Sequence, residues 1–596
     1  MLARTDSRAR ALVLLLLAAI GATMIGARLT WWQVAQQPWL AEMALHQLAQ
    51  HQEIPAERGE ITDRNGELLA TSVELQSVFA TPPTVEDPGL TATILASVLD
   101  LPVAELRARL EGDTPWVWLK RRVAPEVAER IRSLDLRGVG MLPETKRVYP
   151  VEGIATDTTI AAQLIGFVDV EGRGQYGVEA GENALLAGSP GMVTAQEDVI
   201  GRRIADSATL VAEPVDGADL RLTIDAGVQN LLEQEIWKTL QLNSATGATG
   251  VIMDAETGAI VAMASYPSYD ANEFATTDGE RFRNPAVSRQ YEPGSVMKAF
   301  TVAAALDAGA ITTRDTVVDD NNLQLRGARI QNADRARFPG GHGAITPADV
   351  LALSNNVGAA KIGLKLGPAA LYEAFRRFGF GSPTGIELAG EASGVVWNPD
   401  GPNASGELTA AQNAFGQGLS VTSVQLLAGY AAFPNGGMLV TPHVVEGFTD
   451  PDGTFHDVEL PPGERILRPE TAETMVELLV NAIDDGIANR ASIPGYTVAG
   501  KTGTAQIAAP TSVTNENGET VEVWRYVDGW VDSSFVGFLP EAETKLVTVI
   551  TIHRPAGAGG PQMPDRPEWV YARLMDQVVD YLAIPPDRPV EPVAQP

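Results

Sequence analysis

A serine and a lysine three positions apart are the residues of this chain best suited to catalysis. Ser295 and Lys298 lie in YEPGSVMKAFTVAAALDAGA (291–310), where Pro293-Gly294 interrupts the backbone before a periodic apolar helix. A spacing of three places both side chains on one helix face, and the helix N-terminus favours negative charge on an attacking oxygen. Lys298 is the available base for the serine hydroxyl once burial or nearby cations lower its pKa. Alone, S-x-x-K more often marks a helix cap and a surface lysine.

A second polar segment interrupts another apolar helix. ITPADVLALSNNVGAAKIG (345–363) begins with the cap Thr346-x-x-Asp349 and carries Ser354 and Asn356 where a core helix would have leucine or alanine. Local capping of a helix end is the alternative explanation for these two residues.

A third segment, GYTVAGKTGTAQ (495–506), combines an ammonium with hydroxyls. The predicted strand carries Lys501, Thr502, Gly503 and Thr504. The glycine would let a ligand's backbone lie against the strand edge. The letters also fit the phosphate-binding pattern G-x-x-x-x-G-K-[ST]. Its β-branched interior and the lack of a following helix argue against a phosphate loop.

Composition excludes several functions. The 596 residues include 44 Lys+Arg and 75 Asp+Glu, and the net charge of -31 repels nucleic acid. There is no cysteine, which excludes Cys-based metal sites, and the six histidines lack metal-ligand spacing, which argues against a zinc hydrolase.

The N-terminus has the pattern of a membrane anchor. Three arginines within residues 1–10 precede an uncharged apolar run over 11–27, and Trp31-Trp32 suit a membrane interface. With no evident cleavage site, the sequence predicts a retained span over 11–32, a cytoplasmic tail and an extracytoplasmic remainder.

Glycine and proline residues mark domain and element boundaries in the chain that follows the predicted membrane span. Short apolar runs over 50–215 predict a β-rich domain of strands and turns, 216–584 predict a mixed α/β domain, and 585–596 a disordered Pro-rich tail. Within the second domain we expect a strand and helix at 220–236, a hairpin at 248–267, helices at 295–380 and 469–485, strands at 496–508 and 533–555, and a helix at 568–583.

The order and spacing of the three motifs resemble those of a known protein family. S-x-x-K, then S-x-N 59 positions later, then K-T-G are the ordered motifs of penicillin-binding proteins and serine β-lactamases. RGEITDRNGELLA, KRVYP, LIGFVDVEGRGQYGVE and SSFVGFLP resemble class B penicillin-binding proteins, and YEPGS resembles their septal, FtsI-like branch. The implied fold is an α/β (α+β) penicillin-binding/serine β-lactamase-like transpeptidase domain with a β-rich N-terminal pedestal and one transmembrane helix.

The resemblance also implies an activity, a peptidoglycan D,D-transpeptidase of the bacterial cell membrane that acts in septal wall synthesis and is inhibited by β-lactams. Ser295 would attack the stem peptide's D-Ala-D-Ala carbonyl and Lys298 would take the serine proton. Ser354 would pass a proton to the leaving D-alanine. No metal or organic cofactor would have a role. The substrate-binding residues would be Asn356 for the donor amide and Lys501, Thr502, Gly503 and Thr504 for its carboxylate and backbone, with the Ser295 and Thr504 N–H groups forming the oxyanion hole.

Other activities remain open at this stage. Residues 30–215 show no class A glycosyltransferase motif, so the resemblance implies a SEDS-type glycosyltransferase and other divisome proteins as partners. An elongation-type transpeptidase, a D,D-carboxypeptidase, a β-lactamase or a non-catalytic scaffold or sensor are the alternatives. A β-lactamase would need a water-activating base, and the sequence identifies none.

Overall fold

The structure is a computed structural model that forms two compact units. It describes residues 7–37, 39, 49–196, 209–401, 405–514, 520–556 and 562–589. One unit comprises residues 1–57 and 188–217, and the other comprises 58–187 and 218–596. Residues 1–6 of the predicted cytoplasmic tail and 590–596 of the predicted Pro-rich tail lie outside the described residues.

The first unit contains a long apolar helix and a small sheet. Helix α1 (Ser7–Thr30) continues into a π-helical turn (Trp31–Ala35), and the apolar stretch Arg10–Val34 is 25 residues long and wholly unburied. This length and exposure fit a single-pass membrane anchor. The sheet is antiparallel, with the order β1 (Ala49–Ile54), β8 (Gly191–Gln196), β9 (Thr209–Ala212).

The second unit begins with a sheet that draws strands from distant parts of the chain. Its order is β19 (Phe455–Asp457), β18 (Val445–Thr449), β10 (Asp219–Leu222), β2 (Ile61–Thr62), β3 (Leu68–Ala80), β4 (Val117–Val123), with β5 (Val139–Val148) also paired to β3. β10 pairs with β2 in parallel. Strands β2 to β5 therefore belong to the same sheet as β10, β18 and β19, which come after residue 218.

Three helices occur where we expected only strands and turns. They are α3 (Pro88–Leu99), α4 (Val103–Leu110) and α5 (Pro125–Leu134), and they pack with β3 and β4 in one apolar core. Short apolar runs fit a strand as well as a two-turn helix, so local signals decide. Asp87 caps α3 by accepting a hydrogen bond from the Leu90 N–H, and prolines begin α3 and α5.

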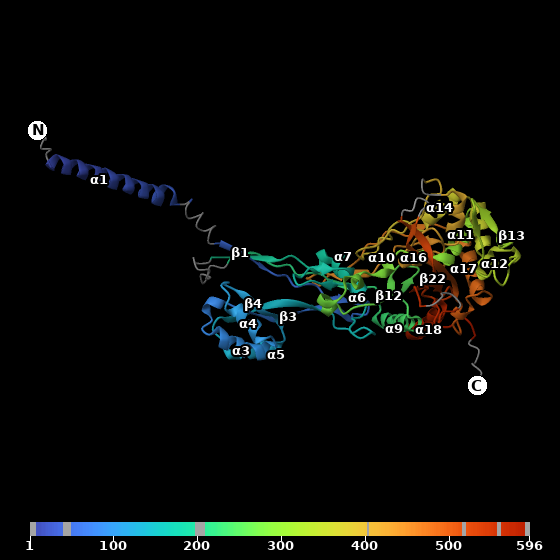
Figure 1. The fold of residues 1–596 in the computed structure, drawn as a ribbon, viewed down its shortest axis with the longest axis horizontal. Helices are drawn as coiled ribbons and strands as arrows, with labels where there is room; N and C mark the ends of the chain where they lie inside the picture. The colour runs from blue at the N-terminus through green and yellow to red at the C-terminus, as the bar shows by residue number, and fades with distance from the viewer. Residues whose placement is uncertain are drawn as a thin grey trace. The chain divides into compact units, whose positions relative to one another are not determined.

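A five-stranded antiparallel sheet forms the centre of the C-terminal part of the chain, from residue 218 onward. Its order is β12 (Ile260–Tyr266), β11 (Gly247–Asp254), β23 (Leu546–His553), β22 (Thr520–Phe538), β21 (Ala499–Thr514). Helices α9 (Ala226–Asn243) and α18 (Pro567–Tyr581) pack together against these strands, as Figure 1 shows. The predicted hairpin, strands and flanking helices are confirmed here.

Helices fill the rest of this part around α11 (Met297–Asp307), which is buried along most of its length. They include α12 (Pro347–Ala352), α13 (Asn356–Leu366), α14 (Pro368–Arg377), α15 (Glu407–Asn413), α16 (Ser423–Ala431) and α17 (Pro469–Asp484). On α11, the Phe300 ring contacts the rings of Phe378, Phe380, Tyr430 and Phe433. This aromatic cluster fixes the helix that carries the candidate nucleophile.

Helices dominate 295–380 as expected, but four short strands that we did not expect lie between α11 and α12. These strands are β13 (Val317–Asp319), β14 (Leu323–Leu325), β15 (Ala328–Ile330) and β16 (Gly343–Ile345). Gly327, Gly341 and Gly343 have positive φ, which ends a helix and suits tight turns.

Candidate active site

Ser295 lies in a tight turn at the start of α11. A single 3₁₀ turn (Gly294–Val296) precedes the helix, and Gly294 has φ 63°. A Cβ on Gly294 would lie 2.7 Å from the Thr504 carbonyl oxygen. Glycine at this position therefore allows the β21 backbone to approach the serine closely.

Lys298 contacts the serine directly. Its Nζ lies 2.8 Å from the Ser295 Oγ and 3.1 Å from the Ser354 Oγ, and it donates to the Ser354 carbonyl oxygen at 2.5 Å. The side chain is fully buried, and this burial lowers the pKa of Lys298 well below its ordinary value. The charge of Lys501 lowers that pKa further, while Asp334 opposes the shift. A neutral Lys298 can accept the serine proton.

Ser354 lies between two lysines. The Lys501 Nζ donates to the Ser354 Oγ at 3.0 Å, opposite Lys298. Lys501 is also buried, and burial lowers its pKa to about 7 although Glu568 opposes the shift. A hydroxyl in contact with both amines is placed to relay a proton between them and a bound group.

The backbone around Ser354 differs from the expected helix. Ser354 has φ 55° and lies in the corner between α12 and α13, not within either helix. The predicted cap is confirmed, because Thr346 and Asp349 form a capping box on α12. The left-handed corner breaks the helical pattern, and it brings the Ser354 side chain to the lysines.

Asn356 begins α13 close to Ser354. Its Nδ2 donates to the Gln331 carbonyl oxygen at 3.0 Å, and its backbone N–H donates to the Asn332 Oδ1 at 2.9 Å. An asparagine amide has a second N–H and a carbonyl oxygen for a ligand.

The K-T-G segment lies on an edge strand, since β21 ends the order of its sheet. Lys501 and Gly503 face inward, whereas Thr502 is half-buried and Thr504 is exposed. A Cβ on Gly503 would lie 2.5 Å from the Ser534 Oγ, so the position has no room for a side chain. An open edge with two hydroxyls can pair with an extended peptide.

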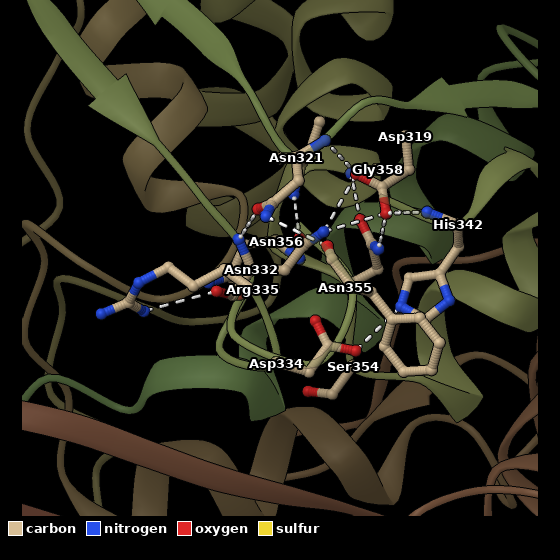
Figure 2. Close-up of polar contacts among 12 residues, drawn as sticks. Asp319, Asn321, Asn332, Asp334, Arg335, His342, Ser354, Asn355, Asn356 and Gly358 are labelled. Carbon is tan, nitrogen blue, oxygen red and sulfur yellow. Dashed lines mark hydrogen bonds and ion pairs between the residues drawn. The ribbon is translucent and has the colours of Figure 1, made fainter. Parts of the chain in front are cut away.

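The sequence analysis missed a buried carboxylate beside this site. Asp319 accepts hydrogen bonds from the backbone N–H groups of Asn321 and His342, both at 2.9 Å, and from the side chains of Asn332 at 2.9 Å and Asn355 at 2.7 Å (Figure 2). Burial alone would raise the pKa of Asp319, but these donors lower it overall. The signal in the sequence is the run of Asp and Asn over 319–322, because these side chains favour turns and local hydrogen bonds over a helix interior.

Asp319 acts on the S-x-N segment through two asparagines. The Asn355 Oδ1 accepts the Gly358 N–H at 2.7 Å and so caps α13, and the Asn332 Oδ1 accepts the N–H groups of Asn356 and Val357. The start of α13 is therefore held by side chains that Asp319 holds in turn.

These features define an acyl-serine enzyme. A serine at a helix start contacts a buried, low-pKa lysine, a second serine bridges to another lysine, and an open strand edge lies alongside. Among the residues that the structure describes, no group of three or more His, Cys, Asp or Glu side chains could hold a metal ion.

Comparison with known proteins gives the family. The family model "Penicillin binding protein transpeptidase domain" matches residues 248–567, and the model "Penicillin-binding Protein dimerisation domain" matches residues 53–222. The chain belongs to the class B penicillin-binding proteins, a family of serine acyltransferases. The predicted family, fold class and type of enzyme are thereby confirmed.

Relatives match along almost the whole chain. "Stage V sporulation protein D" of Bacillus subtilis is 32% identical over 560 residues, which cover 92% of this chain and 82% of that protein. "Peptidoglycan D,D-transpeptidase FtsI" of Escherichia coli K12 is 30% identical over 572 residues, covering 94% and 90%. A crystal structure of penicillin binding protein 3 from Mycobacterium tuberculosis, complexed with aztreonam, has a TM-score of 0.66 and 25% identity, covering 91% of this chain and all of that one.

Proposed function

We propose that this chain is a peptidoglycan D,D-transpeptidase in which Ser295 is the nucleophile and Lys298 the base. The observation that carries the proposal is the 2.8 Å contact between the Lys298 Nζ and the Ser295 Oγ, made by a lysine whose pKa burial lowers. The names of the relatives support the substrate class.

In the first half of the reaction, the Ser295 Oγ bonds to the penultimate D-alanine carbonyl carbon of a stem peptide. Lys298 takes the serine proton, and the oxyanion lies between the N–H groups of Ser295 and Thr504. The amide bond to the terminal D-alanine breaks, and Ser354 passes a proton to its nitrogen. The Ser354 contacts with Lys298 and Lys501 support this relay.

Side chains on β21 and α13 would hold the donor peptide during this step. Thr502 and Thr504 bind its terminal carboxylate, with the positive charge of Lys501 nearby, and Asn356 holds the donor's amide. Gly503 lets β21 pack closely against the turn before Ser295, because a Cβ there would lie 2.7 Å from the Pro293 carbonyl oxygen. The open edge of β21 leaves room for the peptide backbone to lie against the strand.

In the second half, an amine of a neighbouring stem attacks the acyl carbonyl. A new amide bond forms, the bond from the Ser295 Oγ to the acyl carbon breaks, and Ser295 regains its proton. β-Lactams acylate the same serine.

The cellular setting follows from the anchor. We place the tail over 1–10 in the cytoplasm, the span at 11–32 in the bacterial membrane, and a pedestal over 50–215 and a transpeptidase domain over 216–584 outside it. The compact units of the structure are divided at residues 57, 188 and 217. Septal wall synthesis with a SEDS-type glycosyltransferase and other divisome proteins is the role we favour, on the resemblance of YEPGS.

A retention assay tests the activity. We expect the full chain in detergent micelles to bind a fluorescent penicillin and keep the label for an hour, and Ser295→Ala to bind none. An exposed serine, as in Ser97→Ala, is the matched control and should label like the parent chain. Rapid loss of label would favour a β-lactamase, and no label on the parent chain would rule out the nucleophile.

A further inference from the structure

One carboxylate at this site has no part in the steps above. Asp334 lies in the segment that joins β15 to β16, and its charge acts on Lys298 together with that of Lys501. Figure 2 shows Asp334 and Ser354 next to each other below the Asp319 network. The same segment contacts the S-x-N motif, because the Gln331 carbonyl oxygen and the Asn332 Oδ1 accept hydrogen bonds from Asn356. Asp334 therefore lies close to the reactive centre.

The position of Asp334 is fixed by a histidine. The His342 Nε2 lies 2.8 Å from the Asp334 Oδ2, and the His342 ring packs on Phe338 with 4.4 Å between ring centres. The His342 N–H donates to Asp319, and the Asp334 carbonyl oxygen accepts the N–H groups of Arg337 and Phe338. The loop thus holds the carboxylate in place before a ligand arrives.

Asp334 nevertheless stays open to a ligand. Its side chain is 36% exposed, whereas that of His342 is 13% exposed. Within the described part of the chain, Asp334 forms an ion pair with His342 and none with its neighbours Arg335 and Arg337. A half-exposed carboxylate next to a reaction centre favours a positively charged partner.

The two sides of the centre differ in charge. Lys501 and the hydroxyls of Thr502 and Thr504 suit the carboxylate of the donor peptide. Asp334 provides a negative charge on the loop that contacts Asn356, and such a charge suits the second substrate. That substrate is an amine, and a primary amine carries a proton in neutral water.

We propose that Asp334, oriented by His342, binds the primary ammonium group of the acceptor stem peptide. That group gives one proton to water, and the free amine then attacks the acyl carbonyl, with its second proton returning to the Ser295 Oγ. The inference rests on the transpeptidase function proposed above, and it adds the residue that recognises the acceptor. Asp334 is the contact to substrate, and His342 is a positioning residue.

The test compares a charged acceptor with a neutral one. The full chain in detergent micelles is acylated with an acyl-D-alanyl thioester. We then measure how the acyl group divides between hydrolysis by water and transfer to an added amine. The amine is either Nα-acetyl-lysine amide, which is charged, or hydroxylamine, which is neutral at pH 7. Asp334→Asn should lower transfer to the lysine derivative roughly tenfold, as for loss of a charge-assisted hydrogen bond, and transfer to hydroxylamine by less than about twofold.

Two further variants sharpen the comparison. His342→Ala should lower transfer to the lysine derivative by a smaller factor, through a higher acceptor KM. Asp320→Asn is the matched control, because its 54% exposed side chain pairs with Lys361 away from the centre, and it should change neither transfer.

Three results would overturn the proposal. An equal loss with both acceptors would mean that Asp334 shapes the acyl-enzyme, and no loss with either would mean that it does not contact the acceptor. A parent chain that hydrolyses the thioester but transfers to neither amine would remove the transpeptidase function itself, and the acceptor site with it.

Discussion

At the scale of single residues, burial decides the chemistry of the two lysines. Lys298 and Lys501 are among the largest fully buried side chains, and each contacts Ser354. An ammonium loses most of its hydration there, so the neutral amine gains in relative stability. Sequence spacing places Lys298 near Ser295, and burial lowers the pKa of Lys298 so that its neutral amine can take the serine proton.

The shift at Lys501 predicts a dependence of stability on pH. Its pKa is about 7 in the folded chain and near 10.5 when exposed, so the unfolded state binds more protons between these values. Unfolding free energy should therefore rise as pH increases from 7 to 9, and Lys501→Met should flatten that rise. Thermal melts at pH 7, 8 and 9 measure it, with the exposed Lys365→Met as control. Equal slopes for the parent chain and Lys501→Met would contradict the shift.

At the scale of elements, a network beneath the site places the S-x-N segment. The end of β13, the loop before β16 and the start of α13 meet at the Asp319 carboxylate. Because the donors come from separate turns and loops, the carboxylate ties these segments to one another.

Asp319→Asn should weaken acylation more than it weakens the fold. An amide has one acceptor oxygen in place of two, so at least one of Asn332, Asn355 and the His342 N–H loses its partner. We expect penicillin acylation to slow about tenfold or more, with a loss of about 1–3 kcal/mol in stability. Stopped-flow acylation and thermal melts measure the two effects. An unchanged acylation rate would show that the S-x-N segment does not depend on Asp319.

At the scale of the whole molecule, long-range pairing joins segments that differ widely in sequence position. β2 pairs with β10, and β10 pairs with β18, so one sheet contains residues 61–62, 219–222 and 445–449. A buried ionic cluster lies near that junction: the Glu179 carboxylate accepts from Arg58 at 2.6 Å and from Arg147 at 2.8 Å.

Glu179→Gln should destabilise this part of the chain strongly. Its side chain is completely buried, and its loss of charge would leave two guanidinium groups without a counter-charge. Removing one partner of such a cluster costs about 3–5 kcal/mol. Denaturant unfolding measures the loss, and Glu171→Gln, at an exposed carboxylate, is the matched control. A loss below about 1 kcal/mol would show that the cluster contributes no more than a surface pair.

The sequence by itself determined the motifs and the elements with strong local signals. The order of S-x-x-K, S-x-N and K-T-G indicated the family. Periodicity and capping predicted helices α9, α17 and α18, strand β23, and the parts of β21 and β22 within 496–508 and 533–555. The strands extend further, since β21 ends at Thr514 and β22 begins at Thr520. Helices α3 to α5 and strands β13 to β16 did not follow, because short apolar runs fit either structure until packing selects one.

Only the tertiary structure decided which groups surround the serine. Burial of Lys298, the left-handed corner at Ser354 and the convergence of donors on Asp319 depend on contacts between residues far apart in the chain. The position of Asp334 also depends on the tertiary structure. In the sequence, the neighbouring Arg335 and Arg337 make it look like one charge in a solvent-exposed loop of mixed charge. Local sequence fixes propensity, but desolvation and ion pairing depend on what folding brings alongside.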